Sequence, residues 1–259
     1  MSSKKGIFNQ DICRGAGKYL KTGIAGIDSL GGLPAYEIIE ICGSAGVGKS
    51  LLVQQLMISY MCIKKSVYTW YFDIDRTFNP EHLLKLFPER EIEDALSRVY
   101  LYSPLDFSDF IKKLSEVISL KRDSKDNLLI IDSIPNIFLD LGDTSDEEIL
   151  QELQIRIVQI GELLRKFVKE QNTVIVINHV RSLVRKEKII YEQKYFGEPS
   201  NLWLREGIIP ALGGVWEYYV DTRYFLKKIR RDLRILIVVF SNSIPETFVT
   251  VKFVKGKFI

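Results

Sequence analysis

Short apolar runs alternate with longer segments of helical periodicity along most of this chain, and no other feature restricts the possible folds as strongly. Five runs are rich in β-branched and aromatic residues, as strands are, and they cover residues 37–42, 67–73, 99–102, 128–132 and 173–178. In the clearest helical segment, apolar residues from Ile149 to Val168 recur at spacings of three and four. This α/β alternation predicts a mostly parallel sheet with helices on both faces and ligands at the carboxyl ends of its strands.

The last part of the sequence has a different texture. Three further strand-like runs cover residues 222–229, 233–240 and 247–254, and short turns at 230–232 and 242–245 join them. Strands joined so directly run antiparallel, so we expect them to extend the sheet. Neither a repeat of fixed period nor a low-complexity linker divides the chain, which favours a single domain.

Composition narrows the class of protein. With 46% apolar and 27% charged residues, the chain is typical of a globular protein rather than a disordered, coiled-coil or collagen-like one. The difference between 36 Lys and Arg and 33 Asp and Glu is a net charge of +3, too small to identify a polyanionic partner.

Targeting and metal signals are weak. The longest aliphatic and aromatic stretch, Ile235 to Phe240, has six residues where a membrane span needs about twenty, so we expect no membrane association. No apolar segment follows Lys4 and Lys5, which indicates an intracellular protein without a secretory signal. The thiols are scattered without a C-x-x-C pair, so we expect reduced cysteines and no zinc site; they are Cys13, Cys42 and Cys62.

The strongest functional signal is G-S-A-G-V-G-K-S at residues 43–50, which fits the P-loop pattern G-x-x-x-x-G-K-[ST] between a predicted strand and a predicted helix. Such a loop wraps phosphates with backbone N–H groups at a helix N-terminus, with Lys49 at the β and γ phosphates and Ser50 on Mg²⁺. A chance glycine-rich turn is the alternative. The predicted nucleotide-binding set is Gly43, Ser44, Ala45, Gly46, Val47, Gly48, Lys49, Ser50 and Leu51.

Carboxylates follow two other predicted strands. Asp132 ends the run L-L-I-I-D, as a Walker B carboxylate does, and we predict that it orients Mg²⁺, although a plain strand end has the same pattern. Asp73 and Asp75 lie at the end of the second strand. We predict Asp75 as the base that polarises a water attacking the γ phosphate, with Asp73 as support. A turn capped by acidic residues is the alternative.

Taken together, the motifs resemble the RecA/RadA strand-exchange recombinases, and more narrowly the eukaryotic recombinase paralogues. The resemblance runs from about Tyr19 to the last residue and rests on T-G-I-A-G-I-D-S-L-G-G at 22–32, Y-F-D-I-D-R-T-F-N-P-E-H-L at 71–83, V-I-N-H-V at 176–180, and P-A-L-G at 210–213 before Trp216 and Arg223. It implies a RecA-like ATPase domain over residues 22–259 after an N-terminal segment, 1–21, that is too short for the additional helical domain of full recombinases.

Three positions depart from the pattern of that family. Asp75 stands where the family usually has a catalytic glutamate, His82 where an arginine often stacks on adenine, and His179 where a glutamine commonly senses the γ phosphate. A carboxylate one methylene shorter lies farther from its water, so we expect slow hydrolysis. His179 can still donate a hydrogen bond beside the matching Asn178, but it can also be an ordinary core histidine at a strand end.

The resemblance places two DNA loops on this chain. The first maps near residues 140–148, where acidic residues without nearby Lys or Arg would repel phosphate. The second maps to residues 181–209, where cations alternate with aromatic rings that suit single-stranded DNA, although a mobile or partner-binding loop fits as well. The candidate DNA contacts are Arg181, Arg185, Lys186, Lys188, Tyr195 and Phe196. A further basic cluster between Arg223 and Arg234 is more simply explained as a solvated hairpin edge.

Three functions compete. The first is a nuclear, weakly DNA-stimulated ATPase of homologous-recombination repair that binds ATP and Mg²⁺. It would help recombinase filaments assemble on single-stranded DNA, in a hetero-oligomer with other paralogues or accessory subunits. The second is an ATP-holding structural subunit of a paralogue complex with little DNA contact. The third, a helicase-like or circadian-clock-like RecA-fold ATPase, is disfavoured by the series P-A-L-G, Trp216 and Arg223.

Overall fold

The computed structural model describes residues 18–120, 125–142, 146–182 and 207–259. Its centre is a nine-stranded sheet in the order β13-β12-β11-β10-β3-β7-β6-β4-β5. Six adjacent strands, from β10 to β5 in that order, are parallel, whereas β11, β12 and β13 are added antiparallel. The predicted mostly parallel sheet with antiparallel strands at the end of the chain is therefore confirmed.

The strands of the large sheet lie close to the predicted runs. They are β3 (Ile38–Cys42), β4 (Thr69–Asp73), β5 (Val99–Tyr102), β6 (Leu128–Asp132), β7 (Thr173–Asn178), β10 (Thr222–Arg230), β11 (Leu233–Ser241), β12 (Thr247–Val254) and β13 (Lys257–Phe258). Two small sheets pair β1 (Tyr19–Leu20) with β2 (Leu33–Pro34) and β8 (Val180–Ser182) with β9 (Ile208–Pro210).

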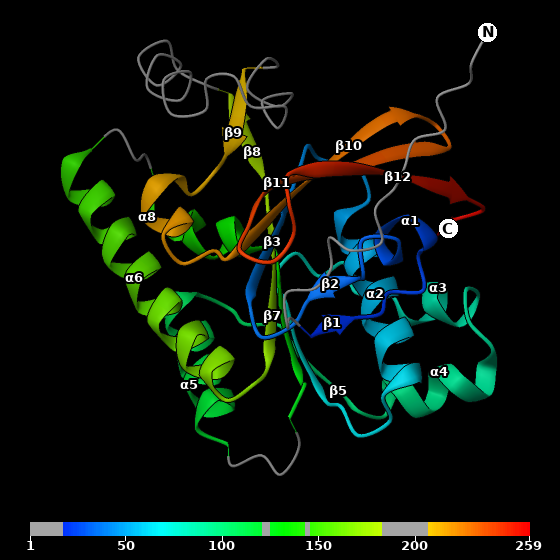
Figure 1. Ribbon diagram of the computed structural model, residues 1–259. Helices are drawn as coiled ribbons and strands as arrows, with labels where there is room; N and C mark the ends of the chain where they lie inside the picture. Colours follow the sequence, from blue (N-terminus) through cyan, green and yellow to red (C-terminus); the bar gives the residue numbers. More distant parts are fainter. Residues whose placement is uncertain (1–17, 121–124, 143–145, 183–206) are drawn as a thin grey trace, which may run out of the picture.

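Helices cover both faces of the sheet, as the alternation predicts (Figure 1). One face carries α1 (Ala25–Asp28), α2 (Lys49–Ile63), α3 (Pro80–Leu84) and α4 (Glu89–Leu96). The other carries α5 (Phe107–Ser119), the 3₁₀ helix η1 (Ile134–Leu141), α6 (Glu147–Lys169) and α8 (Gly213–Glu217). Helix α6 contains the whole predicted segment from Ile149 to Val168, and Asp146 caps it by accepting a hydrogen bond from the Glu148 N–H at 2.9 Å.

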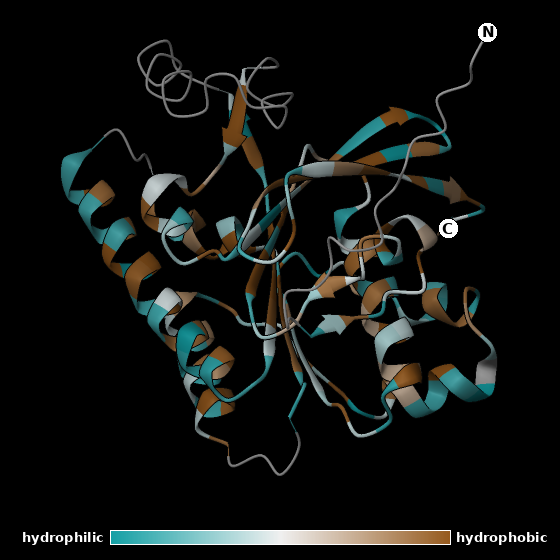
Figure 2. Cartoon of the chain, viewed as in Figure 1, coloured by the Kyte–Doolittle hydropathy of each residue, from teal (hydrophilic) through white to brown (hydrophobic). Residues whose placement is uncertain are grey.

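Hydrophobic side chains form one large core on each face of the sheet, and a smaller cluster joins β9 to β10 and β11. Strands β3 and β7 are buried along their whole length because helices lie on both sides of them, and Figure 2 shows hydrophobic colour along most of the central strands. Alternate residues of one strand serve the two cores, as Ile39 and Ile38 of β3 do. This packing fixes the register that aligns the carboxyl ends of the parallel strands.

The register brings the predicted site to one edge of the sheet. Asp73 at the end of β4 pairs with Asp132 at the end of β6, and Cys42 at the end of β3 pairs with Asn178 at the end of β7. The P-loop, the acidic residues and the β7 end are therefore neighbours in space although they are far apart in sequence.

Candidate nucleotide-binding site

The P-loop connects β3 to α2, as predicted. Its first glycine has no room for a side chain, because a Cβ on Gly43 would lie 2.4 Å from the carbonyl oxygen of Leu226 on β10. Its last glycine, Gly48, is the N-cap of α2 with φ of +101°, a conformation that glycine adopts without steric cost. The loop therefore leads into the N-terminus of a 15-residue helix, whose first N–H groups have no partner within the helix, and this is the backbone arrangement that receives anions.

Lys49 lies within the loop rather than in solvent. Its side chain is buried, and its ammonium donates hydrogen bonds to the carbonyl oxygens of Gly43 at 2.9 Å and Ser44 at 3.0 Å. Burial lowers the pKa of this ammonium, while the carboxylates Asp132 and Asp75 oppose the shift. A buried cation whose hydrogen bonds go to uncharged carbonyl groups is suited to an anionic ligand.

The two predicted metal ligands, Ser50 and Asp132, lie next to each other. The Ser50 hydroxyl donates a hydrogen bond to Asp132 Oδ1 at 3.0 Å, and Asp132 Oδ2 accepts one from the Tyr71 hydroxyl at 2.7 Å. Burial raises the pKa of Asp132, and the hydrogen bonds from Tyr71 and Ser50 oppose the shift. A hydroxyl and a carboxylate oxygen side by side are hard ligands, which fit Mg²⁺. Sequence reasoning missed Tyr71, whose polar tip inside an apolar strand was the available signal.

The two acidic residues at the carboxyl end of β4 have different roles. Asp73 is buried and accepts hydrogen bonds from the backbone N–H groups of Thr77 at 2.9 Å and Phe78 at 3.1 Å, so it caps the turn. The alternative interpretation, an acidic turn cap, therefore describes Asp73. Asp75 instead faces the cavity, with 18% of its side chain exposed.

The Asp75 carboxylate is surrounded by donors from the segment after β6. Ser133 Oγ lies 2.9 Å from Asp75 Oδ2, and Asn136 Nδ2 donates to Asp75 Oδ1 at 2.6 Å. Burial alone would raise the pKa of Asp75, but the hydrogen bonds from His179, Asn136 and Ser133 lower it below its usual value. Ser133 and Asn136 were not predicted, although their place directly after Asp132 was a signal that they would lie here.

His179 joins this cluster from the end of β7. Its Nε2 lies 2.9 Å from Ser133 Oγ and 3.8 Å from Asp75 Oδ2, and a third of the side chain is exposed. The imidazole therefore lies at the cavity and not in the hydrophobic core.

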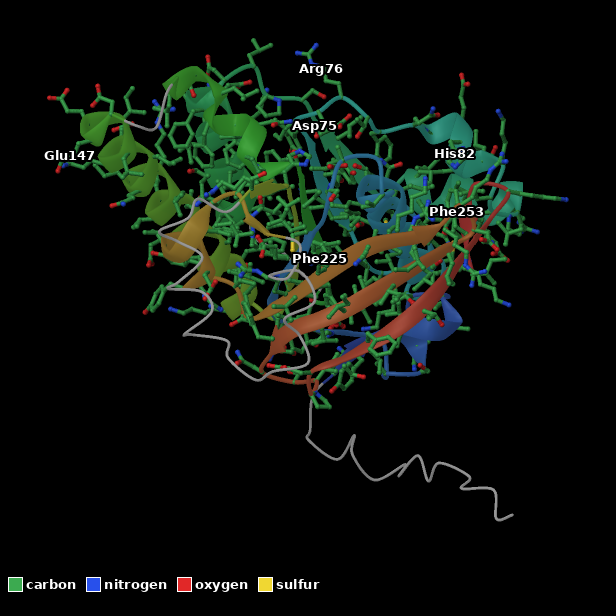
Figure 3. All side chains as sticks on the ribbon, turned by 90° about the horizontal axis from the view of Figure 1, so that it is seen from above. Asp75, Arg76, His82, Glu147, Phe225 and Phe253 are labelled. Atoms are coloured by element: carbon green, nitrogen blue, oxygen red, sulfur yellow. The ribbon has the colours of Figure 1, made fainter. Side chains whose placement is uncertain are left out.

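Most of the predicted nucleotide-binding and catalytic residues line one cavity of about 430 Å³. It is lined by Ala45, Gly46, Gly48, Lys49, Ser50, Leu51, Gln54, Asp75, Thr77, Asn79, His82, Asp132, Ile177 and His179. Gly43, Ser44 and Val47 are absent from the lining, and the Val47 side chain is packed in the core. Figure 3 shows Asp75 and His82 at the same end of the molecule, with His82 toward β12.

Most predicted DNA contacts lie outside the described residues; these are Arg185, Lys186, Lys188, Tyr195 and Phe196. Arg181 is described and belongs to β8, where it pairs with Ile209. The first predicted loop is partly described, and there Arg156 of α6 binds Asp140 at 2.8 Å and Glu152 at 2.7 Å. The acidic charge of that region is therefore partly neutralised by an arginine one helical turn after Glu152.

Two arginines of the basic cluster are buried, which corrects its interpretation as a solvated edge. Arg223 is 1% exposed and binds the carboxylates of Glu40 and Glu217. Arg234 is 5% exposed, and its Nε donates to the carbonyl oxygen of Val47 in the P-loop at 3.0 Å. The two side chains lie on opposite faces of the sheet: Arg223 lies beside Glu40 of β3 on one face, and Arg234 shares the other face with Leu236. Packing on both faces therefore buries them.

The fold and the site together define an α/β protein of the RecA-like class that carries a P-loop. The Rad51 family model matches residues 17–257, so the chain belongs to the Rad51 family. Among the described residues, no helix combines the length and the apolar character that a membrane crossing requires.

Known relatives are similar over most of the chain. "DNA repair and recombination protein RadA" of Methanoculleus marisnigri is 25% identical over 247 residues, covering 88% of this chain and 71% of that protein. Human "DNA repair protein RAD51 homolog 2" is 21% identical over 95% of this chain and 70% of its own length, and "DNA repair protein rhp57" of Schizosaccharomyces pombe is 26% identical over 88% and 75%. The crystal structure of the RadB recombinase has the same fold, with a TM-score of 0.66 at 22% identity over 92% of this chain and 98% of that one.

Proposed function

We propose that this chain binds ATP with Mg²⁺ and helps recombinase filaments assemble or be remodelled on single-stranded DNA during homologous-recombination repair in the nucleus, with weak ATP hydrolysis. One observation carries the nucleotide part of the proposal. The buried Lys49 ammonium lies beside a Ser50 hydroxyl and an Asp132 carboxylate that are 3.0 Å apart, at a cavity that opens onto a helix N-terminus.

Each residue has a defined task in binding. Lys49 exchanges its two carbonyl partners for phosphate oxygens, which replaces neutral acceptors by charged ones at the same cation. Ser50 supplies the hydroxyl ligand, and Asp132 supplies a carboxylate that Tyr71 orients. When bound, Mg²⁺ neutralises charge on the β and γ phosphates.

Slow hydrolysis follows from the surroundings of Asp75. A general base must accept a hydrogen bond from the attacking water, but Ser133 and Asn136 already donate to this carboxylate. The shorter aspartate side chain also places its oxygens farther from the phosphate than a glutamate would. These two effects support a protein that holds ATP for long periods and turns it over rarely.

The relatives support the repair role. RadA, RAD51 homolog 2 and rhp57 are all named as DNA repair proteins, and two of the three belong to eukaryotes, in line with a nuclear location. The expected partners are other recombinase paralogues or accessory subunits, the recombinase filament and single-stranded DNA, in a hetero-oligomer. The segment at residues 181–209 supplies the DNA contacts in this proposal.

Because Ser133 and Asn136 already donate hydrogen bonds to the Asp75 carboxylate, the site also favours the second candidate, an ATP-holding structural subunit with little DNA contact. ATP turnover by the purified protein, measured with and without single-stranded DNA, separates the two candidates. The filament role predicts slow turnover that DNA stimulates, together with salt-sensitive DNA binding. ATP binding that persists without any response to DNA would support the structural subunit instead.

A further inference from the structure

The part of the cavity wall formed by His82 contacts a part of the chain far from the P-loop in sequence. His82, which lines the cavity, has its Nε2 atom 3.2 Å from the carbonyl oxygen of Gly256. A carbonyl can only accept, so Nε2 carries the proton and the tautomer of the ring is determined by this contact. Gly256 lies in the turn between β12 and β13, which we call the β12–β13 turn (residues 255–256).

The β12–β13 turn is fixed to the helix that begins at Lys49. The Phe258 N–H donates to Gln55 Oε1 at 2.9 Å, and Gln55 Nε2 donates to the Phe258 carbonyl oxygen at 2.7 Å, so one buried side chain satisfies both backbone groups. The Phe258 ring packs against Gly48, where a Cβ would lie 3.1 Å from it. The position of His82 relative to the P-loop is therefore set through β13 as well as through α3.

Gly256 has almost no free space toward the imidazole. Its φ is +83°, and a Cβ at this position would lie 3.0 Å from His82 Cε1, closer than ordinary van der Waals contact. An alanine there would push the ring by a few tenths of an ångström. Lys255 also has a positive φ, of 50°. Positive φ at both central residues is the pattern of a type I′ turn, so the conformation of Gly256 is the ordinary one for such a turn.

We propose that Gly256 is a positioning residue for the nucleobase: it orients the His82 ring as the wall against which the base of a nucleoside triphosphate stacks. The proposal rests on the proposed nucleotide function. It adds the contact by which the site would prefer a ligand with a nucleobase over phosphates alone. In the proposed function the P-loop holds the phosphate groups, whereas His82 contacts only the base, so the two contributions to binding can be measured separately.

The test compares ligands with and without a base. Equilibrium binding of ATP and of inorganic tripolyphosphate, both with Mg²⁺, is measured for the wild type, Gly256→Ala, His82→Ala and the double variant. Loss of an aromatic contact corresponds to about two- to tenfold weaker binding. We expect each variant to bind ATP more weakly by this factor and to bind tripolyphosphate with the affinity of the wild type. The double variant should be no weaker than His82→Ala alone, because both changes remove the same contact.

A matched control separates backbone strain from the effect on the ring. Gly142 has a φ of +80°, and no atom lies within 4 Å of the position that a Cβ would occupy there. Gly142→Ala therefore adds a Cβ at a similar positive φ without meeting a neighbour, and it should bind both ligands as the wild type does. Should Gly256→Ala unfold, Gly256→Asn introduces the same Cβ with a residue that tolerates positive φ.

The outcomes are distinct. Equal losses for ATP and tripolyphosphate in Gly256→Ala, or unchanged ATP binding in a folded variant, would overturn the positioning role while leaving the nucleotide site intact. A wild type that binds neither ligand would overturn the proposed function, and the positioning role with it.

Discussion

The buried Glu40 carboxylate offers the most demanding test of the packing behind the P-loop. Glu40 is in the middle of β3 and fully buried, and it accepts hydrogen bonds from Arg223 Nε, from Trp216 Nε1 at 2.8 Å and from Asn178 Nδ2 at 2.6 Å. Replacing it by glutamine keeps the shape and one acceptor oxygen. The change removes the charge that Arg223 faces and turns an NH₂ group toward another donor.

The magnitude follows from what remains around Arg223. Breaking a buried ion pair from one side costs about 3 to 5 kcal/mol. Glu217 still binds Arg223 at 2.9 Å, so the lower end, about 3 kcal/mol, is expected. For a chain of this size each kcal/mol corresponds to about 2 to 4 °C in melting temperature, so Glu40→Gln should melt about 6 to 12 °C lower.

Urea unfolding followed by circular dichroism, with thermal melts beside it, measures this loss. Glu93→Gln on the exposed side of α4 is the control and should change the free energy of unfolding by less than about 0.5 kcal/mol. If Glu40→Gln loses no more than Glu93→Gln, the charge of Glu40 contributes nothing and the reasoning from a buried pair is wrong.

Four further predictions concern the nucleotide site and the predicted DNA-binding segment. Lys49→Ala should abolish binding of a fluorescent ATP analogue, because the phosphates lose their point charge; wild-type affinity would remove the P-loop assignment. Asp75→Asn should keep ATP binding and eliminate turnover, since an amide accepts no proton from water; unchanged turnover would place the base elsewhere. Neutralising three loop cations should weaken single-stranded DNA binding and flatten its salt dependence without affecting ATP binding. The cations are Arg185, Lys186 and Lys188. Alanine at two loop aromatics, Tyr195 and Phe196, should weaken DNA binding by about 1 to 3 kcal/mol per base with little change in salt slope. If both loop variants bind DNA normally but lose a protein partner, the loop is an interface.

The architecture could be predicted from the amino-acid sequence because its signals are local. A run such as L-L-I-I-D at 128–132 is apolar on both sides only if the strand is covered on both faces, and the observed β6 has those bounds. The P-loop was equally predictable, since its glycines, lysine and serine are contiguous and their spacing reflects one loop around one phosphate chain. The antiparallel strands β10 to β12 followed from turns of a few residues between apolar runs.

Residues of the same type, in contrast, could be told apart only in the folded chain. Asp73 and Asp75 are two positions apart, but one caps a turn and the other faces the cavity, because Ser133 and Asn136 approach from a segment about 60 residues away. Arg223 and Arg234 carry the same charge as their exposed neighbours, and packing alone buries them. The contact between His82 and Gly256 joins residues 174 positions apart. No local pattern encodes such pairs, since their distance depends on how β13 and α3 are placed by the whole sheet.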